Sequence, residues 1–123
     1  MSAYLGIEDI TGYHAHVYYS DAETKQRAEI LRAGIEALGI AHVMGRWHDA
    51  PIGPHPVGSY QVAFDAHLFG QLVPWLALNR NGLSVLVHPT TADQVLAHSE
   101  QALWLGPQLT LDLGFLRRYM AGK

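Results

Sequence analysis

Eight histidines are the feature of this 123-residue chain that points most directly to chemistry. They equal in number all its lysines and arginines together, and the chain has no cysteine. Without thiols, disulfides and a cysteine nucleophile are excluded, and any bound metal must take nitrogen and oxygen ligands. Neutral imidazole suits Zn, Cu, Fe and Ni. A site for a transition-metal cation is one account of this excess of histidines, and their spacing along the chain is the first test of it.

Two of the histidines, His14 and His16, are separated by one residue within the segment from Gly12 to Tyr19. This segment is rich in aromatic and β-branched residues and alternates with period two, which predicts a strand. Residues i and i+2 of a strand lie about 6.6 Å apart and project to the same side. His14, His16 and Tyr18 should thus share a face, and two imidazoles so placed can close on one metal with bonds of about 2.0–2.1 Å. The alternative is a pair of polar residues on a solvated face.

The rest of the chain divides into further strands and helices by hydrophobic periodicity, caps and turn residues. The predicted elements are a helix from Ser20 to Leu38 with a Ser20–Glu23 capping box, a strand over 40–46, a proline-rich loop over 47–58, a strand over 59–64, a helix capped by Asp65 through Leu78 that Pro74 kinks or divides, a turn over 79–82, a strand over 83–88, a short helix over 91–98, strand-like alternation at Leu109, Leu111 and Leu113, and helical character over 113–120.

The order strand, helix, strand, strand, helix, strand predicts an α+β, ferredoxin-like sandwich with a C-terminal extension, in one domain spanning residues 1–123. We expect both helices on one face of an antiparallel sheet of order 4-1-3-2, and within it we expect the first and third strands to run parallel. The other face would be open to a ligand, a partner or the C-terminal segment. In that arrangement five histidines gather at one edge of the sheet: His14, His16, His48, His55 and His88.

This convergence predicts roles for the five histidines. His14, His16 and His88 are the expected metal ligands, and His55 and His48 are the candidate general acid/base groups. His55 is also an alternative third ligand in place of His88.

Three further residues are candidates for binding a substrate. Arg46 could clamp a carboxylate by two parallel hydrogen bonds, and Tyr18 and Tyr60 could each donate a hydrogen bond. The alternatives are a solvated arginine and a tyrosine that fills the core. His42 and His67 are predicted to be structural or surface residues. His98 is predicted to end a helix or to act as an outer partner of the site.

The bulk composition excludes several classes of function. The net charge is −3 and the pI about 6.2, and the absence of a basic run argues against nucleic acid binding. No stretch reaches the roughly 20 apolar residues of a membrane span, and no signal peptide is visible. We therefore expect a cytoplasmic protein that acts on a small molecule, and a homodimer formed through the open sheet face.

Four long segments resemble the DOPA 4,5-dioxygenase family: Gly12 to Tyr19, Gly45 to His48, Gly53 to Phe64, and Pro74 to Pro89. The resemblance extends from about residue 10 to 113, and the family's histidine motifs match His14, His16, His48, His55 and His88. The segment from Thr90 to His98 follows the pattern less closely, because the family more often has Gly-Asp where this chain has Ala92-Asp93.

The resemblance implies a ferredoxin-like fold, non-haem Fe(II), O₂ as co-substrate, and extradiol cleavage of a catechol such as DOPA to a muconate semialdehyde. Two alternatives stay open at this point. One is a different histidine–metal enzyme, a zinc or manganese hydrolase or isomerase. The other is a non-enzymatic dimeric module that binds a small molecule.

Overall fold

A computed structural model describes residues 3–122 of the chain. Its regular elements, in chain order, are η1 (Ile7–Asp9), β1 (Gly12–Tyr19), α1 (Ala22–Ala37), β2 (Val43–Met44), β3 (Gly58–Asp65), η2 (Ala66–Leu68), α2 (Phe69–Asn79), β4 (Val85–Pro89), α3 (Gln94–Ala97), β5 (Leu103–Leu105) and α4 (Leu113–Ala121), where η denotes a 3₁₀ helix. Within residues 3–122 no helix combines the length and the apolar character needed to cross a membrane.

The five strands form one antiparallel sheet in the order β2-β3-β1-β4-β5. The predicted α+β, ferredoxin-like fold is confirmed, but the expectation that the first and third strands run parallel is wrong. Gly12 pairs with Asp65, and Tyr19 pairs with Gly58. The crossover through α1 leaves β1 and β2 parallel, and the chain then reverses into β3, so β3 runs opposite to its neighbour β1.

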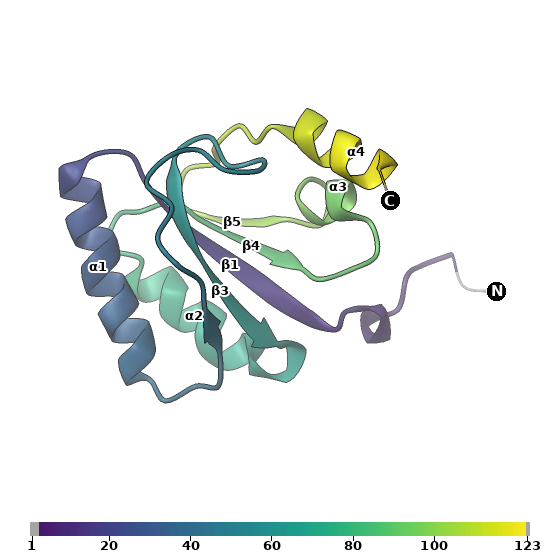
Figure 1. The fold of residues 1–123 in the computed structure, drawn as a ribbon. Coiled ribbons are helices and arrows are strands. Elements are labelled where there is room, and N and C mark those ends of the chain that lie inside the picture. The colour runs from purple at the N-terminus through teal and green to yellow at the C-terminus, as the bar shows by residue number, and fades with distance from the viewer. Residues whose placement is uncertain (1–2, 123) are drawn as a thin grey trace.

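The two faces of the sheet have different coverings (Figure 1). Helices α1 and α2 cover one face, and the core lies between them and the sheet. Ala15, Val17 and Tyr19 of β1 point into this core together with Val85 and Val87 of β4, as their alternation predicts. Opposite, the loop that follows β2, the short α3 and the C-terminal α4 lie over the second face. Hereafter we call this second face, which carries His14, His16 and Tyr18, the open face.

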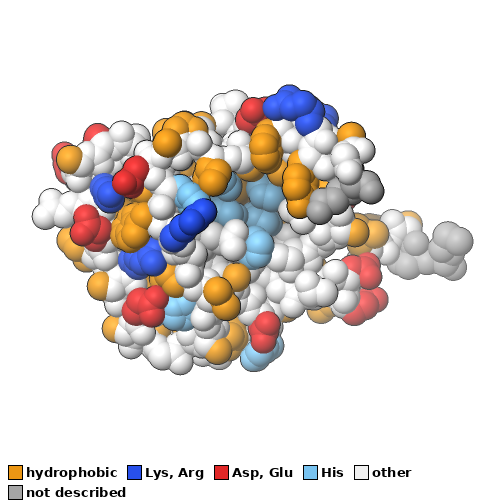
Figure 2. Space-filling view, in the orientation of Figure 1, with side chains coloured by type: hydrophobic (Ala, Val, Ile, Leu, Met, Phe, Trp, Pro, Cys, Tyr) orange, Lys and Arg blue, Asp and Glu red, His pale blue; other side chains and the backbone are white. Residues whose placement is uncertain are grey.

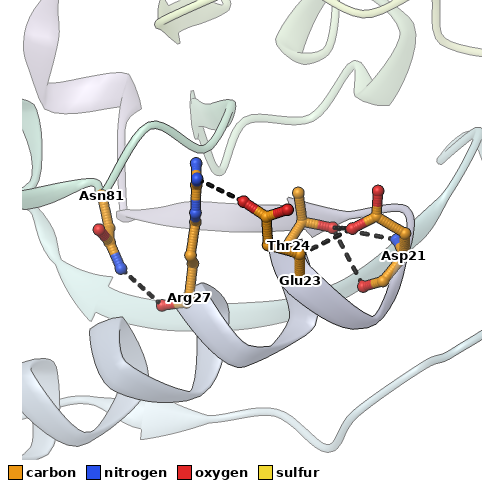
Figure 3. Close-up of polar contacts among 5 residues, drawn as sticks. All are labelled: Asp21, Glu23, Thr24, Arg27 and Asn81. Carbon is orange, nitrogen blue, oxygen red and sulfur yellow. Dashed lines mark hydrogen bonds and ion pairs between the residues drawn. The ribbon is translucent and has the colours of Figure 1, made fainter.

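Helix α1 begins with a capping box, although not the one predicted (Figure 3). Asp21 is the N-cap and accepts a hydrogen bond from the backbone N–H of Thr24 at 2.8 Å, while the Thr24 hydroxyl accepts from the Asp21 N–H at 3.0 Å. The prediction of Ser20 with Glu23 is thus displaced by one residue. Glu23 instead pairs with Arg27 at 2.6 Å, one turn along the helix. The Arg27 carbonyl accepts a hydrogen bond from Asn81, which links α1 to the turn before β4.

Pro74 lies inside α2, which runs unbroken from Phe69 to Asn79. Of the two predicted outcomes, a kink or a division of the helix, the division is wrong. Proline removes the hydrogen bond to the carbonyl four residues earlier, here that of Gly70. Both residues are exposed, so water can satisfy that carbonyl. Asp65 makes no side-chain cap, and the chain passes through η2 before α2 begins.

The C-terminal third differs most from the predicted elements. The short strand β5 pairs with β4 and widens the sheet by one strand, a feature not predicted. The alternation at Leu109 and Leu111 produces no strand, whereas the helix expected from Leu113 onward is present as α4. Asp112 caps α4 through the Phe115 N–H, and its own N–H donates to the Pro54 carbonyl at 2.8 Å. This bond ties the start of α4 to the loop between β2 and β3.

Candidate metal centre

The adjacent strands β1 and β4 place three histidines on the open face. His14 pairs directly with His88 across the two strands, and His16 lies two residues further along β1. The ligand nitrogens available on these three rings lie within 4.8 Å of one another. The predicted set of metal ligands is therefore brought together by strand pairing, and Figure 2 shows histidine side chains gathered in a hollow at the middle of this side of the molecule.

The separation of the ring nitrogens fits one shared cation. His16 Nε2 lies 3.0 Å from His88 Nε2. Two nitrogens bound at about 2.05 Å to one ion would be separated by roughly 2.9 Å at a right angle and about 3.3 Å at the tetrahedral angle. The observed distance falls within this interval, so little movement is needed for both rings to bind the same metal.

Backbone contact fixes which nitrogen of His88 carries the proton. Its Nδ1 lies 3.1 Å from the carbonyl oxygen of Pro89, and a carbonyl oxygen can only accept. Nδ1 is therefore protonated in the neutral ring, and Nε2 presents a lone pair toward His16. This is the usual way in which a ligand histidine is oriented, since its second nitrogen donates to a carbonyl or a carboxylate.

Burial keeps the clustered imidazoles neutral. His16 is 5% exposed and His88 1%. Burial, reinforced by the neighbouring imidazoles, lowers the pKa of His16 well below its ordinary value of 6.5 and that of His88 to about 3. The pKa of His14 is also lowered, chiefly by burial. Since a metal binds only the neutral ring, the lowered pKa values keep these three residues available to a metal below pH 6.5.

His55 joins the cluster, but along a different chain path from the one predicted. Because β3 is antiparallel to β1, the segment before β3 lies beside the end of β1 and not its start. His55 nevertheless lies over the open face, 4.3 Å from the His16 ring between centroids, because the loop before β3 folds back across the sheet. Its Nδ1 lies 2.7 Å from Tyr18 Oη. Burial, together with the charges that His98 and His48 would carry, lowers the pKa of His55 to about 4.

His48 faces the same cavity because of a β-bulge. Val43 pairs with Ala63 and His48 with Ser59, so five steps on one strand oppose four on the other, which leaves one extra residue. Ser59 pairs with Tyr18, whose side chain lies on the open face. A cavity of about 220 Å³ lies at this place, lined by His16, His48, Ile52, Gly53, Pro54, His55, Ser59 and Gln61.

His98 belongs to the cluster more closely than predicted. Its ring centroid lies 3.9 Å from that of His88 and 6.1 Å from that of His16. Its Nδ1 lies 2.7 Å from the Gln94 carbonyl oxygen, so the lone pair of the neutral ring is on Nε2, and burial lowers its pKa. The short helix α3, which Asp93 caps, carries it onto the open face. The sequence signal available was Asp93, a favourable N-cap residue that sets where this helix begins.

Two of the predicted substrate-binding residues, Tyr60 and Arg46, lie in different surroundings in the structure. Tyr60 is fully buried on the helix-covered face, where its hydroxyl donates to the Ala28 carbonyl at 3.0 Å, so its assignment to substrate binding is wrong and it fills the core. It pairs with Val17, a core-facing residue of β1, and so points away from the histidines. Arg46 is exposed beside the bulge, two residues before His48, and its substrate contact stays a prediction.

The remaining histidines are structural or exposed, as predicted. His42 Nδ1 lies 2.6 Å from the Ile40 carbonyl oxygen, and its Nε2 lies 3.3 Å from Glu36. His67 is an exposed residue of η2. Neither belongs to the group of convergent ligand nitrogens.

Fold and site together define an α+β protein of ferredoxin-like type with a buried histidine centre suited to a divalent metal. Residues 13–115 match the model of the Dopa 4,5-dioxygenase family. The chain belongs to this family, and membership supports a dioxygenase function.

Similar proteins agree with this assignment. The DOPA 4,5-dioxygenase of Amanita muscaria is 32% identical, over 88% of this chain and 50% of the fungal protein. An uncharacterized 21.2 kDa protein of Botryotinia fuckeliana is 43% identical, over 86% of this chain and 63% of that protein. The chain thus spans only half to two thirds of these relatives. The crystal structure of a "putative dioxygenase" from Nostoc punctiforme superposes with a TM-score of 0.91 at 47% identity, covering 94% of this chain and 99% of that one.

Proposed function

We propose that this protein is a non-haem Fe(II) dioxygenase that opens the ring of a catechol beside its two hydroxyl groups. Both atoms of O₂ would enter the product, a muconate semialdehyde. The single observation that carries the proposal is the convergence of His14, His16 and His88, which each offer one ring nitrogen within 4.8 Å of the others. The similarity to a DOPA 4,5-dioxygenase supports the reaction type.

Three neutral imidazoles would hold the iron and leave coordination positions for other ligands. The bound ion would supply an electronic connection between an aromatic diol and dioxygen. The role of the protein is to keep these rings neutral and oriented, which burial and the contact between His88 and the Pro89 carbonyl achieve.

Proton transfer would fall to His55, with His48 as the alternative. Both line the cavity next to His16. A catechol must lose protons to bind as an anion, and ring opening needs a proton returned; a positioned histidine is the usual group for such transfers and contributes about 10²–10⁴-fold in rate. The roughly 220 Å³ of the cavity is below the range of about 300–1,000 Å³ typical of drug-sized ligands, and favours a substrate with one ring.

Oxygen uptake tests this function. The metal-free protein is loaded anaerobically with Fe(II) and then exposed to air with DOPA, caffeate and plain catechol in turn. We expect stoichiometric consumption of O₂ and a yellow product that absorbs in the visible. An iron-loaded protein that consumes no oxygen with any member of the panel would refute the proposal.

A catalytic zinc site is the second candidate, because three histidines are also a ligand set of zinc enzymes. Elemental analysis of protein purified with its metal intact, combined with the oxygen measurement, separates the two. Zinc at one equivalent without oxygen uptake would favour a hydrolase or isomerase. The homodimer expected from the sequence stays a prediction.

A further inference from the structure

Tyr18 is a buried residue whose hydroxyl is in hydrogen-bond contact with one of the clustered histidines, and no role has yet been derived for it. It lies on the open face of β1 and is 3% exposed. Its ring stacks on Trp104 of β5, with centroids 5.9 Å apart and planes 22° from parallel. Its hydroxyl lies 2.7 Å from His55 Nδ1. Little of Tyr18 is accessible to a ligand, which argues against the substrate contact expected from its position in the sequence.

The direction of the hydrogen bond between Tyr18 and His55 follows from counting donors. A phenol has one O–H donor, and neutral imidazole has one N–H donor and one acceptor nitrogen. Among residues 3–122 the hydrogen-bond partner of Tyr18 Oη is His55 Nδ1. If His55 Nδ1–H donated, the buried hydroxyl hydrogen would have no acceptor, at a cost of about 1–3 kcal/mol. The favoured arrangement therefore has Tyr18 donating and His55 Nδ1 accepting.

We propose that Tyr18 is a positioning residue that holds His55 in the tautomer with its proton on Nε2. His88 has the opposite tautomer, because a backbone carbonyl takes its Nδ1 proton. His88 thus presents a lone pair and is suited to bind a metal, whereas neutral His55 presents an N–H and is suited to donate a hydrogen bond. In this tautomer His55 has no free lone pair toward the cavity, so removal of a catechol proton would fall to His48, which lines the same cavity. This assignment separates the roles of the two histidines, which the sequence left interchangeable.

The packing around Tyr18 suits this function. Trp104 lies opposite Leu86 in the β4–β5 pair and lies against the phenol ring, so the hydroxyl has little freedom to turn away. His55 itself comes from a loop, where orientation by a neighbouring group matters more than in a strand. Among residues 3–122, His55 makes two hydrogen bonds: the bond with Tyr18 and the backbone bond from the His55 N–H to the Ile52 carbonyl, at 3.0 Å.

NMR of metal-free protein labelled with ¹⁵N-histidine tests the tautomer directly at pH 8, independently of any activity. We expect the His55 proton on Nε2 and the His88 proton on Nδ1, with assignments made from His55→Gln and His88→Gln. In Tyr18→Phe the His55 signals should move toward a mixture of tautomers. Tyr19→Phe removes a buried hydroxyl from the opposite face of the same strand, where it contacts the His48 carbonyl and Asp49, and should leave His55 unchanged.

The kinetic consequence rests on the proposed dioxygenase function. Tyr18→Phe should lower kcat by about 10- to 100-fold, the usual loss when the group orienting a functional histidine is removed, with KM nearly unchanged. A rise in KM at unaltered kcat would instead assign Tyr18 to substrate binding and overturn the proposal. So would a wild-type His55 with its proton on Nδ1, whether or not the protein consumes oxygen.

Discussion

Acidification should destabilise the metal-free protein steeply, because its clustered histidines must stay neutral in the folded state. Burial lowers the pKa of His55 to about 4 and that of His88 to about 3, while in the unfolded chain both return to about 6.5. Between the folded and unfolded values, the unfolded state binds more protons. Stability is therefore fully present above pH 6.5 and is lost as the pH falls below it.

The magnitude can be worked out for a single step from pH 8 to pH 5.5. Each buried histidine that stays neutral in the folded state lowers the free energy of unfolding by about 1.4 kcal/mol over one pH unit below 6.5. His55 and His88 together then contribute a loss of about 3 kcal/mol. His16, which is buried deeply and has its pKa lowered well below 6.5, acts in the same direction. Stopping at pH 5.5 avoids most of the titration of carboxylates.

Urea unfolding with a chelator present measures this loss. With a slope of about 1–3 kcal/mol per molar urea, a change of 3 kcal/mol lowers the midpoint by about 1–3 M. His88→Gln should lower stability at pH 8 but reduce the pH-dependent loss by about 1.4 kcal/mol, and His55→Gln is the parallel variant if the first folds poorly. The exposed His67→Gln is the matched control. Equal urea midpoints of the parent protein at the two pH values would refute the reasoning. So would a pH-dependent loss of stability in both His88→Gln and His55→Gln that is as large as in the parent protein.

Two shorter predictions test the site and the core. His16→Ala should lose bound iron in elemental analysis while His67→Ala retains about one equivalent, because only His16 belongs to the convergent group; equal iron in both would contradict the ligand assignment. Tyr60→Phe should lower the free energy of unfolding by about 1 kcal/mol, because the hydrogen bond to the Ala28 carbonyl is lost. The KM for a catechol should stay unchanged, and a raised KM would instead indicate that Tyr60 contacts the substrate.

The parts of the fold that follow local rules could be predicted from the sequence. Strand β1 has the predicted bounds, and its alternation separates His14 and His16 from Ala15 and Val17 as the structure does. His88 could be placed because the end of an antiparallel β4 lies beside the start of β1, as the pairing of His14 with His88 shows. The two-residue period and the element order were sufficient to place the three expected metal ligands together on one face of the sheet.

The remainder of the site depends on loops and a short helix, whose positions cannot be predicted from hydrophobic periodicity. His55 and His98 lie in a loop and at the end of a four-residue helix. Their positions depend on long-range contacts such as the bond from the Asp112 N–H to the Pro54 carbonyl. Tyr60 lies close to the site residues in the sequence, but its register pairs it with core-facing Val17, so its side chain points away from the histidines.

The net charge of a centre made only of neutral imidazoles depends on whether its ion is bound. Burial and the neighbouring imidazoles account for the lowered pKa values of His16 and His88, and no carboxylate within residues 3–122 contributes to them. The metal-free cluster is thus neutral and buries no net charge. With a divalent cation bound, neutral ligands cancel none of its charge, whereas each carboxylate ligand would cancel one unit. Opposite unit charges 4 Å apart attract by about 4 kcal/mol at an effective dielectric constant of 20. This favours a ligand that arrives as an anion with two adjacent oxygens, which is the form of a deprotonated catechol.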